Sequence, residues 1–300
     1  MKKWRCWILY KKIGFFLLII TLLGCSKDEK KVVVASKPHT EQYILGEIIS
    51  QTIENNTDIK VEKKFGIGGG TSNIHPAMEK GDVDIYPEYD STGWSFVLKN
   101  PPLPDGKDLL SELRKQYSYK YKIKWLNYYG FNNTYALAMK KDLAENLGIN
   151  SYSDLAKKSQ DLKFGAEYDF YEREDGFKNL EKNYGMDFGN KKELDIGLKY
   201  LSIGENQVDV INVFSTDALL KKYNLKVLND DKNLFPPYYA ATVVREETLK
   251  KYPELEPALK KLDNNINNNE MIEMNYLVEI ENKDPKDVAH EFLKNKGIIK

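Results

Sequence analysis

The sequence predicts a two-lobed α/β protein, a clamshell whose mainly parallel sheets carry helices on both faces. Apolar runs of strand length alternate along the chain with segments of helical periodicity, which is the pattern of a parallel sheet covered on both sides. The alternation is interrupted at 130–134 and again at 233–237, and after the first interruption it begins anew. Two lobes joined by two crossings would leave a cleft that closes on a ligand by hinge motion.

The first elements follow from short apolar runs and the residues that bound them. Val32-Val33-Val34-Ala35 predicts a buried strand, and Thr40 is expected to cap a helix whose isoleucine and leucine residues recur at helical spacing. Ser72 is expected to cap the next helix, with Pro76 in its first turn. The other elements expected before the first crossing are strands at 59–65, 83–86 and 123–129 and a helix at 107–117.

Beyond the first crossing the pattern restarts, and Ser151 is expected to cap a helix. The strands expected here lie at 135–139, 164–167, 208–214 and 239–244, and the helices at 152–158, 174–184, 192–201 and from Glu246 onward. We therefore expect lobe 1 to comprise 32–131 together with 233–300, and lobe 2 to comprise 132–232.

The N-terminus is predicted to be a targeting segment. Basic residues precede an apolar run at 13–23, which is shorter than the roughly 20 residues that a permanent spanning helix needs. The run ends in Leu22-Leu23-Gly24-Cys25, which resembles the signal box of bacterial lipoproteins. The resemblance implies a signal peptide at 1–24, lipidation of Cys25 and a polar tether at 25–31. The alternative is an uncleaved signal anchor in which Cys25 has no role.

Composition limits the classes of function. The chain has 45 basic and 45 acidic residues, so no broad positive field points to nucleic acid. Cleavage would remove Cys6, one of only two cysteines, and leave no disulfide framework. The three histidines do not show metal-ligand spacing, and the glycine run at 66–70 lacks the ending of a nucleotide-binding loop. We therefore expect neither a metal nor a cofactor.

Several short motifs occur in the order of a known family. They are Ser36-Lys37-Pro38 with Glu41-Gln42, Gly68 to Thr71, Asp84 to Tyr89, Gly130 to Tyr135, Arg173 to Gly176, Ser215 to Asp217 and Phe235 to Tyr238. Together they resemble the glycine betaine/carnitine/choline-binding proteins of osmoprotectant ABC transporters. The resemblance runs from about Val32 to the C-terminus and implies a type II periplasmic-binding-protein clamshell.

The resemblance also implies which residues bind the ligand. A quaternary ammonium has no N–H to donate, so a protein holds it by apolar contact and the negative faces of aromatic rings. The positions implied for this aromatic box are Tyr89, Tyr135, Phe214 and Tyr238, and those implied for the ligand carboxylate are Lys37, Thr92 and Arg173. The chain departs from the family pattern at Phe214, where tyrosine is usual, and at Asp90-Ser91, where the family has threonine and glycine.

The implied function is capture of a small betaine at the outer face of the cytoplasmic membrane. The protein would be a lipid-anchored monomer without catalytic activity, with an ABC permease and its ATPase as partners. Two basic groups favour a zwitterion over choline, whereas Asp90 near the box favours choline, which remains the alternative. Two further classes stay open from the residues alone. A secreted hydrolase would need a nucleophile–base pair, and an adhesion lipoprotein would bind a macromolecule.

Overall fold

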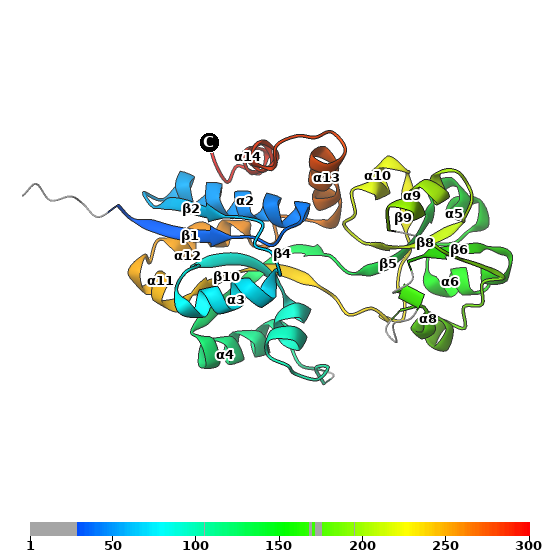
Figure 1. Cartoon of the computed structure of the whole chain (residues 1–300), viewed down its shortest axis with the longest axis horizontal. Helices are drawn as coiled ribbons and strands as arrows, with labels where there is room; N and C mark the ends of the chain where they lie inside the picture. The colour runs from blue at the N-terminus through cyan, green and yellow to red at the C-terminus, as the bar shows by residue number, and fades with distance from the viewer. Residues whose placement is uncertain (1–28, 105, 168–169, 172–175, 195) are drawn as a thin grey trace, which may run out of the picture.

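The computed structural model describes residues 29–300 except 105, 168–169, 172–175 and 195. The predicted signal peptide, Cys25 and Arg173 therefore lie outside the described residues. Two α/β lobes lie side by side along the long axis of the molecule (Figure 1), each built on a sheet of five strands. We call the part built on the sheet that contains β1 lobe 1, and the part built on the other sheet lobe 2.

The sheet of lobe 1 has the strand order β2-β1-β3-β10-β4. Strand β1 runs parallel to both β2 and β3, whereas β10 runs antiparallel to both β3 and β4. The strands are β1 (Lys31–Ala35), β2 (Lys60–Lys64), β3 (Ile85–Tyr89), β4 (Ile123–Asn132) and β10 (Tyr239–Arg245).

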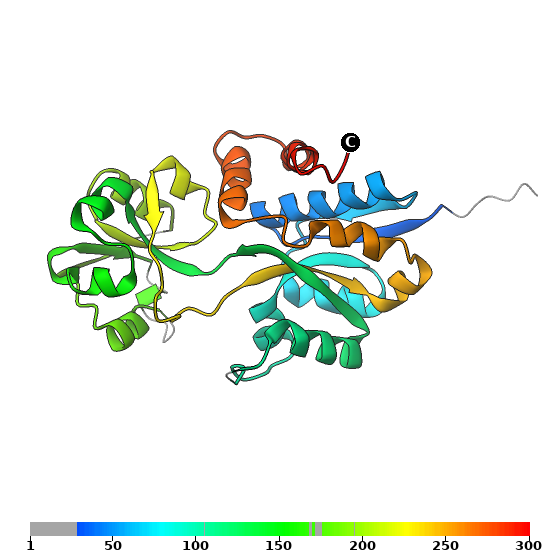
Figure 2. The same cartoon turned by 180° about the vertical axis from the view of Figure 1, so that it is seen from behind.

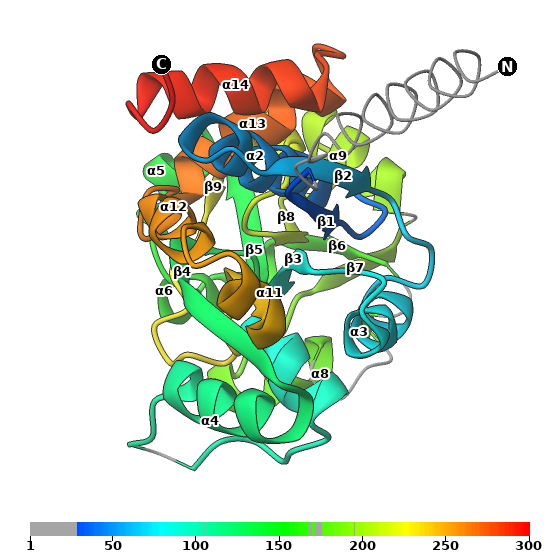
Figure 3. The same cartoon turned by 90° about the vertical axis from the view of Figure 1, so that its left-hand side faces the viewer.

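Helices cover both faces of this sheet (Figure 3). Because side chains alternate along a strand, Val34 and Tyr89 contact one helical layer, whereas Ala35 and Tyr86 contact the other. The first layer contains α2 (Thr40–Asn56), α12 (Leu255–Leu259), α13 (Asn268–Glu279) and α14 (Pro285–Asn295). The second contains α3 (Thr71–Lys80) and α4 (Leu109–Tyr121). The π-helix Thr92–Val97, α11 (Glu246–Lys251) and the 3-10 turn Lys260–Leu262 complete the lobe.

The sheet of lobe 2 has the order β7-β6-β8-β5-β9 and repeats the same arrangement. Its strands are β5 (Tyr135–Lys140), β6 (Lys163–Ala166), β7 (Asn190–Glu193), β8 (Val210–Phe214) and β9 (Leu225–Val227). Its helices are α5 (Lys141–Leu147), α6 (Tyr152–Ala156), the 3-10 turn Ser159–Asp161, α8 (Phe177–Tyr184), α9 (Ile196–Gly204) and α10 (Leu219–Lys222). Buried apolar clusters fill the space on both faces.

The two-lobed α/β prediction is confirmed, with one correction to the sheets. Strands β5 and β10 each start at the crossing between the lobes and run away from it, so they lie antiparallel to neighbours that run toward it. Each sheet is therefore mixed, with two parallel and two antiparallel pairings, instead of mainly parallel. The exact division of the lobes at 131/132 and 232/233 stays a prediction.

The two crossings lie side by side (Figure 2) and are hydrogen-bonded to each other. The Asn133 amide N–H donates to the Tyr238 carbonyl at 3.1 Å, and the Tyr238 N–H donates to Asn132 Oδ1 at 2.7 Å. The Thr134 hydroxyl donates to the Pro236 carbonyl at 2.7 Å. These hydrogen bonds fix Tyr238 and the residues around Asn133 relative to each other at the point where the two lobes meet.

Glycine is required at the base of the first crossing. Gly130 has φ of +118°, and a Cβ at this position would lie 2.8 Å from the Ile266 carbonyl oxygen. The segment after the 3-10 turn Lys260–Leu262 thus packs directly against the backbone of β4.

Three local predictions need correction. The N-cap of α2 is His39, whose side chain makes no capping bond, and Thr40 is already helical. Helix α3 begins at Thr71, which places Pro76 in its second turn. Lys192 belongs to β7 instead of a helix, because the short charged strand 190–193 pairs with the buried β6 and carries no apolar alternation of its own. The cap at Ser151 is confirmed, as a capping box with Asp154.

Candidate functional site

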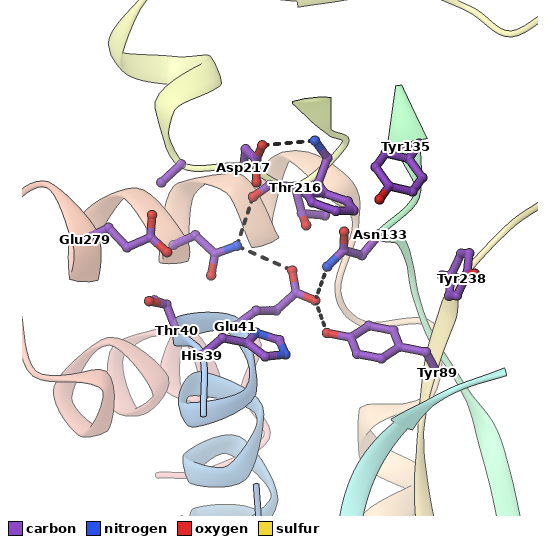
Figure 4. Close-up of a pocket in the computed structure, with 13 residues that line it drawn as sticks. His39, Thr40, Glu41, Tyr89, Asn133, Tyr135, Thr216, Asp217, Tyr238 and Glu279 are labelled. Atoms are coloured by element: carbon purple, nitrogen blue, oxygen red, sulfur yellow. Dashed lines mark hydrogen bonds between the residues drawn. The ribbon is translucent and has the colours of Figure 1, made fainter. Parts of the chain in front are cut away.

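A cavity of about 570 Å³ lies where the lobes meet (Figure 4). Lobe 1 contributes the start of α2, the end of β3 and the last turns of α13, and lobe 2 contributes the start of β5 and the end of β8 with the residues that follow it. The two crossings add Asn133 and Tyr238. This volume falls within the range of ordinary small-molecule sites.

Aromatic rings form the lobe 2 side of the cavity. Tyr135 and Phe214 are directly opposite each other on the paired strands β5 and β8, so their side chains share one face of the sheet. Their rings stack with centroids 4.7 Å apart. Phe170 and Phe235 also pack against the Tyr135 ring, with ring centroids 5.8 and 5.9 Å from it. Phe214 keeps 40% of its surface exposed, so its ring is available to a ligand.

A buried carboxylate lies on the lobe 1 side, at the first turn of α2. Glu41 is only 4% exposed and accepts hydrogen bonds from the Tyr89 hydroxyl, from Asn133 Nδ2 at 3.0 Å and from Asn275 Nδ2 at 3.4 Å (Figure 4). Burial raises the pKa of Glu41, against the effect of these donors, which lower it. The group joins residues from α2, β3, the first crossing and α13.

Two more carboxyl groups and a histidine line the cavity. Burial raises the pKa of Asp217, which accepts from the Tyr200 hydroxyl and from the Phe214 N–H at 2.9 Å. Burial also raises the pKa of Glu279. Burial, with Lys37 nearby, lowers the pKa of His39 to about 4. Among the described residues that line the cavity there is no lysine and no arginine.

The structure brings together the four residues predicted for the aromatic box. Tyr89, Tyr135, Phe214 and Tyr238 all line the same cavity, although they come from β3, β5, β8 and the second crossing. Tyr89 is 6% exposed and its hydroxyl points to Glu41 (Figure 4). The ring positions predicted from short motifs far apart in sequence are therefore neighbours in space.

The residues predicted for the ligand carboxylate do not line this cavity where they are described. Lys37 Nζ lies 2.5 Å from Glu88 Oε1 and 4.8 Å from the centre of the Tyr89 ring. Thr92 is the first residue of the π-helix 92–97. Arg173 lies outside the described residues. A role for these three in binding an anion stays a prediction.

Asp90 does not add a charge to the cavity. Its carboxylate is 1% exposed and accepts from the Tyr128 hydroxyl at 2.9 Å and from the Tyr239 N–H at 3.0 Å. Burial raises the pKa of Asp90 to about 7. Asp90 is hydrogen-bonded to strands β4 and β10 instead of facing a ligand. Its charge therefore gives no reason to favour choline.

Sequence reasoning did not assign roles to the polar residues of the cavity. Glu41, Asn133 and Asp217 lie inside motifs that were recognised, but nothing in their spacing shows that they converge. Asn275 and Glu279 come from α13, far along the chain. The capping box formed by Asn267 and Glu270 marks the start of that helix, yet it does not reveal which face meets the cavity.

Neither a metal centre nor a membrane-spanning helix is found in the described part of the chain. No group of three or more histidine, cysteine, aspartate or glutamate residues there has the arrangement of a metal site. Within the same residues, no helix has the length and apolar character that crossing a bilayer demands.

Comparison with known proteins identifies related chains. Residues 30–295 match the family model described as the substrate binding domain of ABC-type glycine betaine transport systems. The chain is 48% identical over 290 residues to the ergothioneine transport permease/ergothioneine binding protein EgtU of Helicobacter pylori, covering 95% of this chain and 52% of that protein. It therefore spans about half the length of that relative.

A second relative matches over nearly its whole length. The carnitine transport binding protein OpuCC of Listeria monocytogenes is 35% identical over 283 residues, covering 93% of this chain and 92% of that protein. A crystal structure described as a glycine betaine/carnitine/choline ABC transporter aligns with a TM-score of 0.85 and 33% identity, over 90% of this chain and 99% of the other. The type II periplasmic-binding-protein fold implied by the motifs is confirmed.

Proposed function

This chain belongs to the family of substrate-binding domains of ABC-type glycine betaine transport systems, and we propose that it captures a quaternary ammonium zwitterion for an ABC importer. The observation that carries the proposal is the convergence of Tyr89, Tyr135, Phe214 and Tyr238 on one cavity. Each desolvated ring contributes about 0.5–2 kcal/mol to the binding of a cation. Four rings suit a methylated nitrogen that offers no hydrogen-bond donor.

The rings alone do not suffice for tight binding. A micromolar complex needs about 8 kcal/mol net, and four rings supply at most about that much before binding entropy is met. We propose that the negative end of the ligand is held by Arg173, with Lys37 and Thr92 as further candidates. For Lys37 to reach a ligand it must exchange its bond to Glu88, which makes Arg173 the first of the three to test.

Substrate-binding proteins of ABC importers work outside the cytoplasm, and we propose the same site of action here. Lipidation at Cys25 would hold the protein at the outer face of the cytoplasmic membrane. An ABC permease with its ATPase would take the ligand from the closed clamshell. We propose that the chain acts as a monomer, with 132–232 moving against 32–131 and 233–300 about the two crossings.

The named ligands of the relatives share one chemical group and differ in the rest. Ergothioneine and carnitine are both trimethylammonium zwitterions, but the first also carries an imidazole-2-thione ring and the second a hydroxyl group. Glycine betaine is the smallest, with no further polar group. The cavity of about 570 Å³ has room for any of them. We therefore expect the polar side chains around Glu41 to discriminate among these three ligands more than the cavity volume does.

Choline is a second candidate because of the charges that line the cavity. Glu41, Asp217 and Glu279 carry carboxyl groups, and the described lining residues include no lysine or arginine. A cation without a carboxylate would meet no repulsion from these groups. The zwitterion proposal requires that the attraction between Arg173 and the ligand carboxylate outweighs the repulsion from these carboxyl groups.

Calorimetric titration separates the candidates. The mature protein is titrated with ergothioneine, carnitine, glycine betaine, choline, histidine and spermidine. The proposal expects binding of trimethylammonium zwitterions and none of histidine, which lacks the methyl groups. Arg173→Ala should weaken the binding of glycine betaine much more than the binding of choline. Arg114→Ala serves as the control, because the Arg114 side chain donates to Asn127 in lobe 1. Binding of histidine or spermidine alone would overturn the proposal.

A further inference from the structure

Two amide oxygens beside the cavity are buried without a hydrogen-bond partner among the described residues. They are Asn133 Oδ1 and Asn275 Oδ1. Asn275 is 4% exposed, and both side chains line the cavity. In each residue the amide nitrogen is already used. Asn133 Nδ2 donates to Glu41, and Asn275 Nδ2 donates to Glu41 and to the Thr216 carbonyl at 2.9 Å. These nitrogen bonds fix the oxygens as the atoms without partners.

Glu41 adds further acceptor capacity at the same place. A carboxylate offers about four lone-pair sites. Oε1 accepts from Tyr89 and Asn133, Oε2 receives a long 3.4 Å contact from Asn275, and the Thr216 hydroxyl donates to the carboxyl as well. With the two amide oxygens, the three side chains therefore hold more acceptor sites than donors where α2, α13 and the first crossing meet beside the cavity. Figure 4 shows Asn133 between Glu41 and Tyr135.

Buried acceptors of this kind are costly unless a donor reaches them. Leaving one unsatisfied costs about 1–3 kcal/mol, which corresponds to about 5- to 150-fold in affinity for a ligand that supplies the missing donor. Neither end of glycine betaine can do so, because its nitrogen is fully methylated and its carboxylate is an acceptor.

We propose that Glu41, Asn133 and Asn275 form a donor-binding subsite, which selects a betaine that carries N–H or O–H groups beyond its ammonium and carboxylate. The inference rests on the proposed function, since the rings must hold the methylated nitrogen. The occupant it favours is a betaine with an N–H-bearing heterocycle. A ring with two N–H groups, such as an imidazole-2-thione, serves two of the acceptors at once, and a single hydroxyl serves one.

The geometry also defines the rival explanation. Asn275 lies on α13 of lobe 1 and already bonds to Thr216 of lobe 2. Closure of the lobes could bring a protein donor to the two oxygens instead of a ligand donor. In that case the three residues would support closure for every ligand alike. The distinguishing quantity is therefore the ratio of affinities between matched ligands, not any single affinity.

Two matched ligand pairs provide that ratio. Carnitine and γ-butyrobetaine differ by one hydroxyl group, and ergothioneine and glycine betaine differ by the donor-bearing ring. Calorimetry on the full mature chain should give tighter binding of the donor-bearing member in both pairs, by about tenfold or more for ergothioneine. Equal affinities within both pairs would overturn the subsite, while binding of all four would leave the proposed function standing.

Glu41→Gln tests the assignment to these residues. It keeps the shape of the side chain and replaces one acceptor oxygen with a donor. The loss of charge weakens all four cationic ligands similarly, so the ratio within each pair isolates the hydrogen bond. Glu47→Gln is the matched control, since Glu47 is on the same helix, buried, and paired with Lys63 at 2.6 Å outside the cavity.

Asn275→Ala provides a second, independent variant. Its control is Asn268→Ala on the same helix, which removes the 2.8 Å bond from Asn268 to the Asn132 carbonyl and the 3.2 Å bond from the Asn132 N–H to Asn268 Oδ1. Asn268 does not line the cavity. The subsite predicts that Glu41→Gln and Asn275→Ala each lower the ergothioneine-to-glycine betaine preference about fivefold or more, while both controls preserve it. An unchanged preference in both variants, with affinities lowered equally for all ligands, would assign the residues to closure and refute the subsite. Absence of binding by every trimethylammonium ligand to the wild-type chain would refute the proposed function as well.

Discussion

The two sides of the cavity differ in whether their side chains bind other protein groups or remain open to a ligand. On the lobe 1 side, charged and polar groups are buried and satisfied mostly by other protein groups, as in the Lys37–Glu88 pair and the bonds around Glu41. On the lobe 2 side, the stacked rings of Tyr135 and Phe214 leave apolar surface open to the cavity. Changes to groups that bind other protein groups, such as the Lys37–Glu88 pair, should therefore alter stability, and changes to the open rings should alter affinity.

Lys37→Met should have the largest effect on the free energy of unfolding. The Glu88 side chain is fully buried and Lys37 nearly so, and removing one partner of a buried ion pair costs about 3–5 kcal/mol. Urea unfolding measures this loss. Lys63→Met, which breaks the more exposed pair with Glu47, is the control and should cost about 1 kcal/mol or less.

The double variant Lys37→Met/Glu88→Gln sharpens the test. Removing both charges should recover most of the lost stability, because no uncompensated charge remains buried. If Lys37→Met leaves unfolding unchanged and instead abolishes binding of carboxylate ligands, Lys37 contacts the ligand and the contrast between the two sides fails at this residue.

Asp90→Asn should change how stability depends on pH. The carboxyl has a folded-state pKa of about 7, raised from 3.8 by burial, so the folded protein keeps this proton after the unfolded chain has lost it. Its contribution to stability is thus fully present below about pH 4 and is lost as the pH rises toward 7, by at most about 1.4 kcal/mol per pH unit. Asp90→Asn should remove this dependence of the free energy of unfolding on pH.

Urea unfolding at several pH values between 5 and 8 measures the difference between Asp90→Asn and the wild type. Other carboxyl groups with raised pKa contribute equally to both proteins and cancel. Asparagine can keep the bonds that Asp90 makes, with its oxygen toward the Tyr239 N–H and its amide nitrogen toward the Tyr128 oxygen. Identical slopes in the two proteins would show that Asp90 is ionised in the fold throughout this range.

Phe214→Ala should lower affinity and leave stability nearly unchanged. The ring is 40% exposed, so its loss removes little buried core, but a bound cation loses one of its four rings. The expected loss is about 2- to 30-fold for any trimethylammonium ligand, measured by calorimetry. The control is Leu201→Ala, because Leu201 is an apolar residue of lobe 2 with a similar exposure of 45% and lies outside the cavity. An affinity equal to wild type would exclude Phe214 from the box.

Tyr89→Phe should have the smallest effect. The ring that faces the cavity is kept, and only the hydroxyl donor to Glu41 is lost. We expect a loss of about 1 kcal/mol in the free energy of unfolding and a change in affinity of only a few fold. Urea unfolding and calorimetry on the same preparation measure both. A large loss of affinity at unchanged stability would place the Tyr89 hydroxyl in direct contact with the ligand.

Much of the fold could be predicted from local pattern alone. Strands such as Val32–Ala35 and helices such as the one that follows Ser151 are specified by residues adjacent in sequence, through apolar runs and caps. The charged strand Asn190–Glu193 could not be predicted, because its place in the sheet is fixed by pairing with β6 and not by its own side chains.

The sequence by itself determined the two-lobed fold and the family, and it predicted four rings that the fold brings to one cavity, because each of these rests on short motifs. Only the tertiary structure decided that Glu41, Asn133 and Asn275 meet beside those rings, and that Lys37 and Asp90 turn to protein partners. The donors that Asn133 and Asn275 bring to Glu41 lie 92 and 234 residues away in the chain, and the partners of Lys37 and Asp90, Glu88 and Tyr128, lie 51 and 38 residues away. The direction of a buried polar side chain is set by whichever donor or acceptor the fold brings near it, and no local pattern records that.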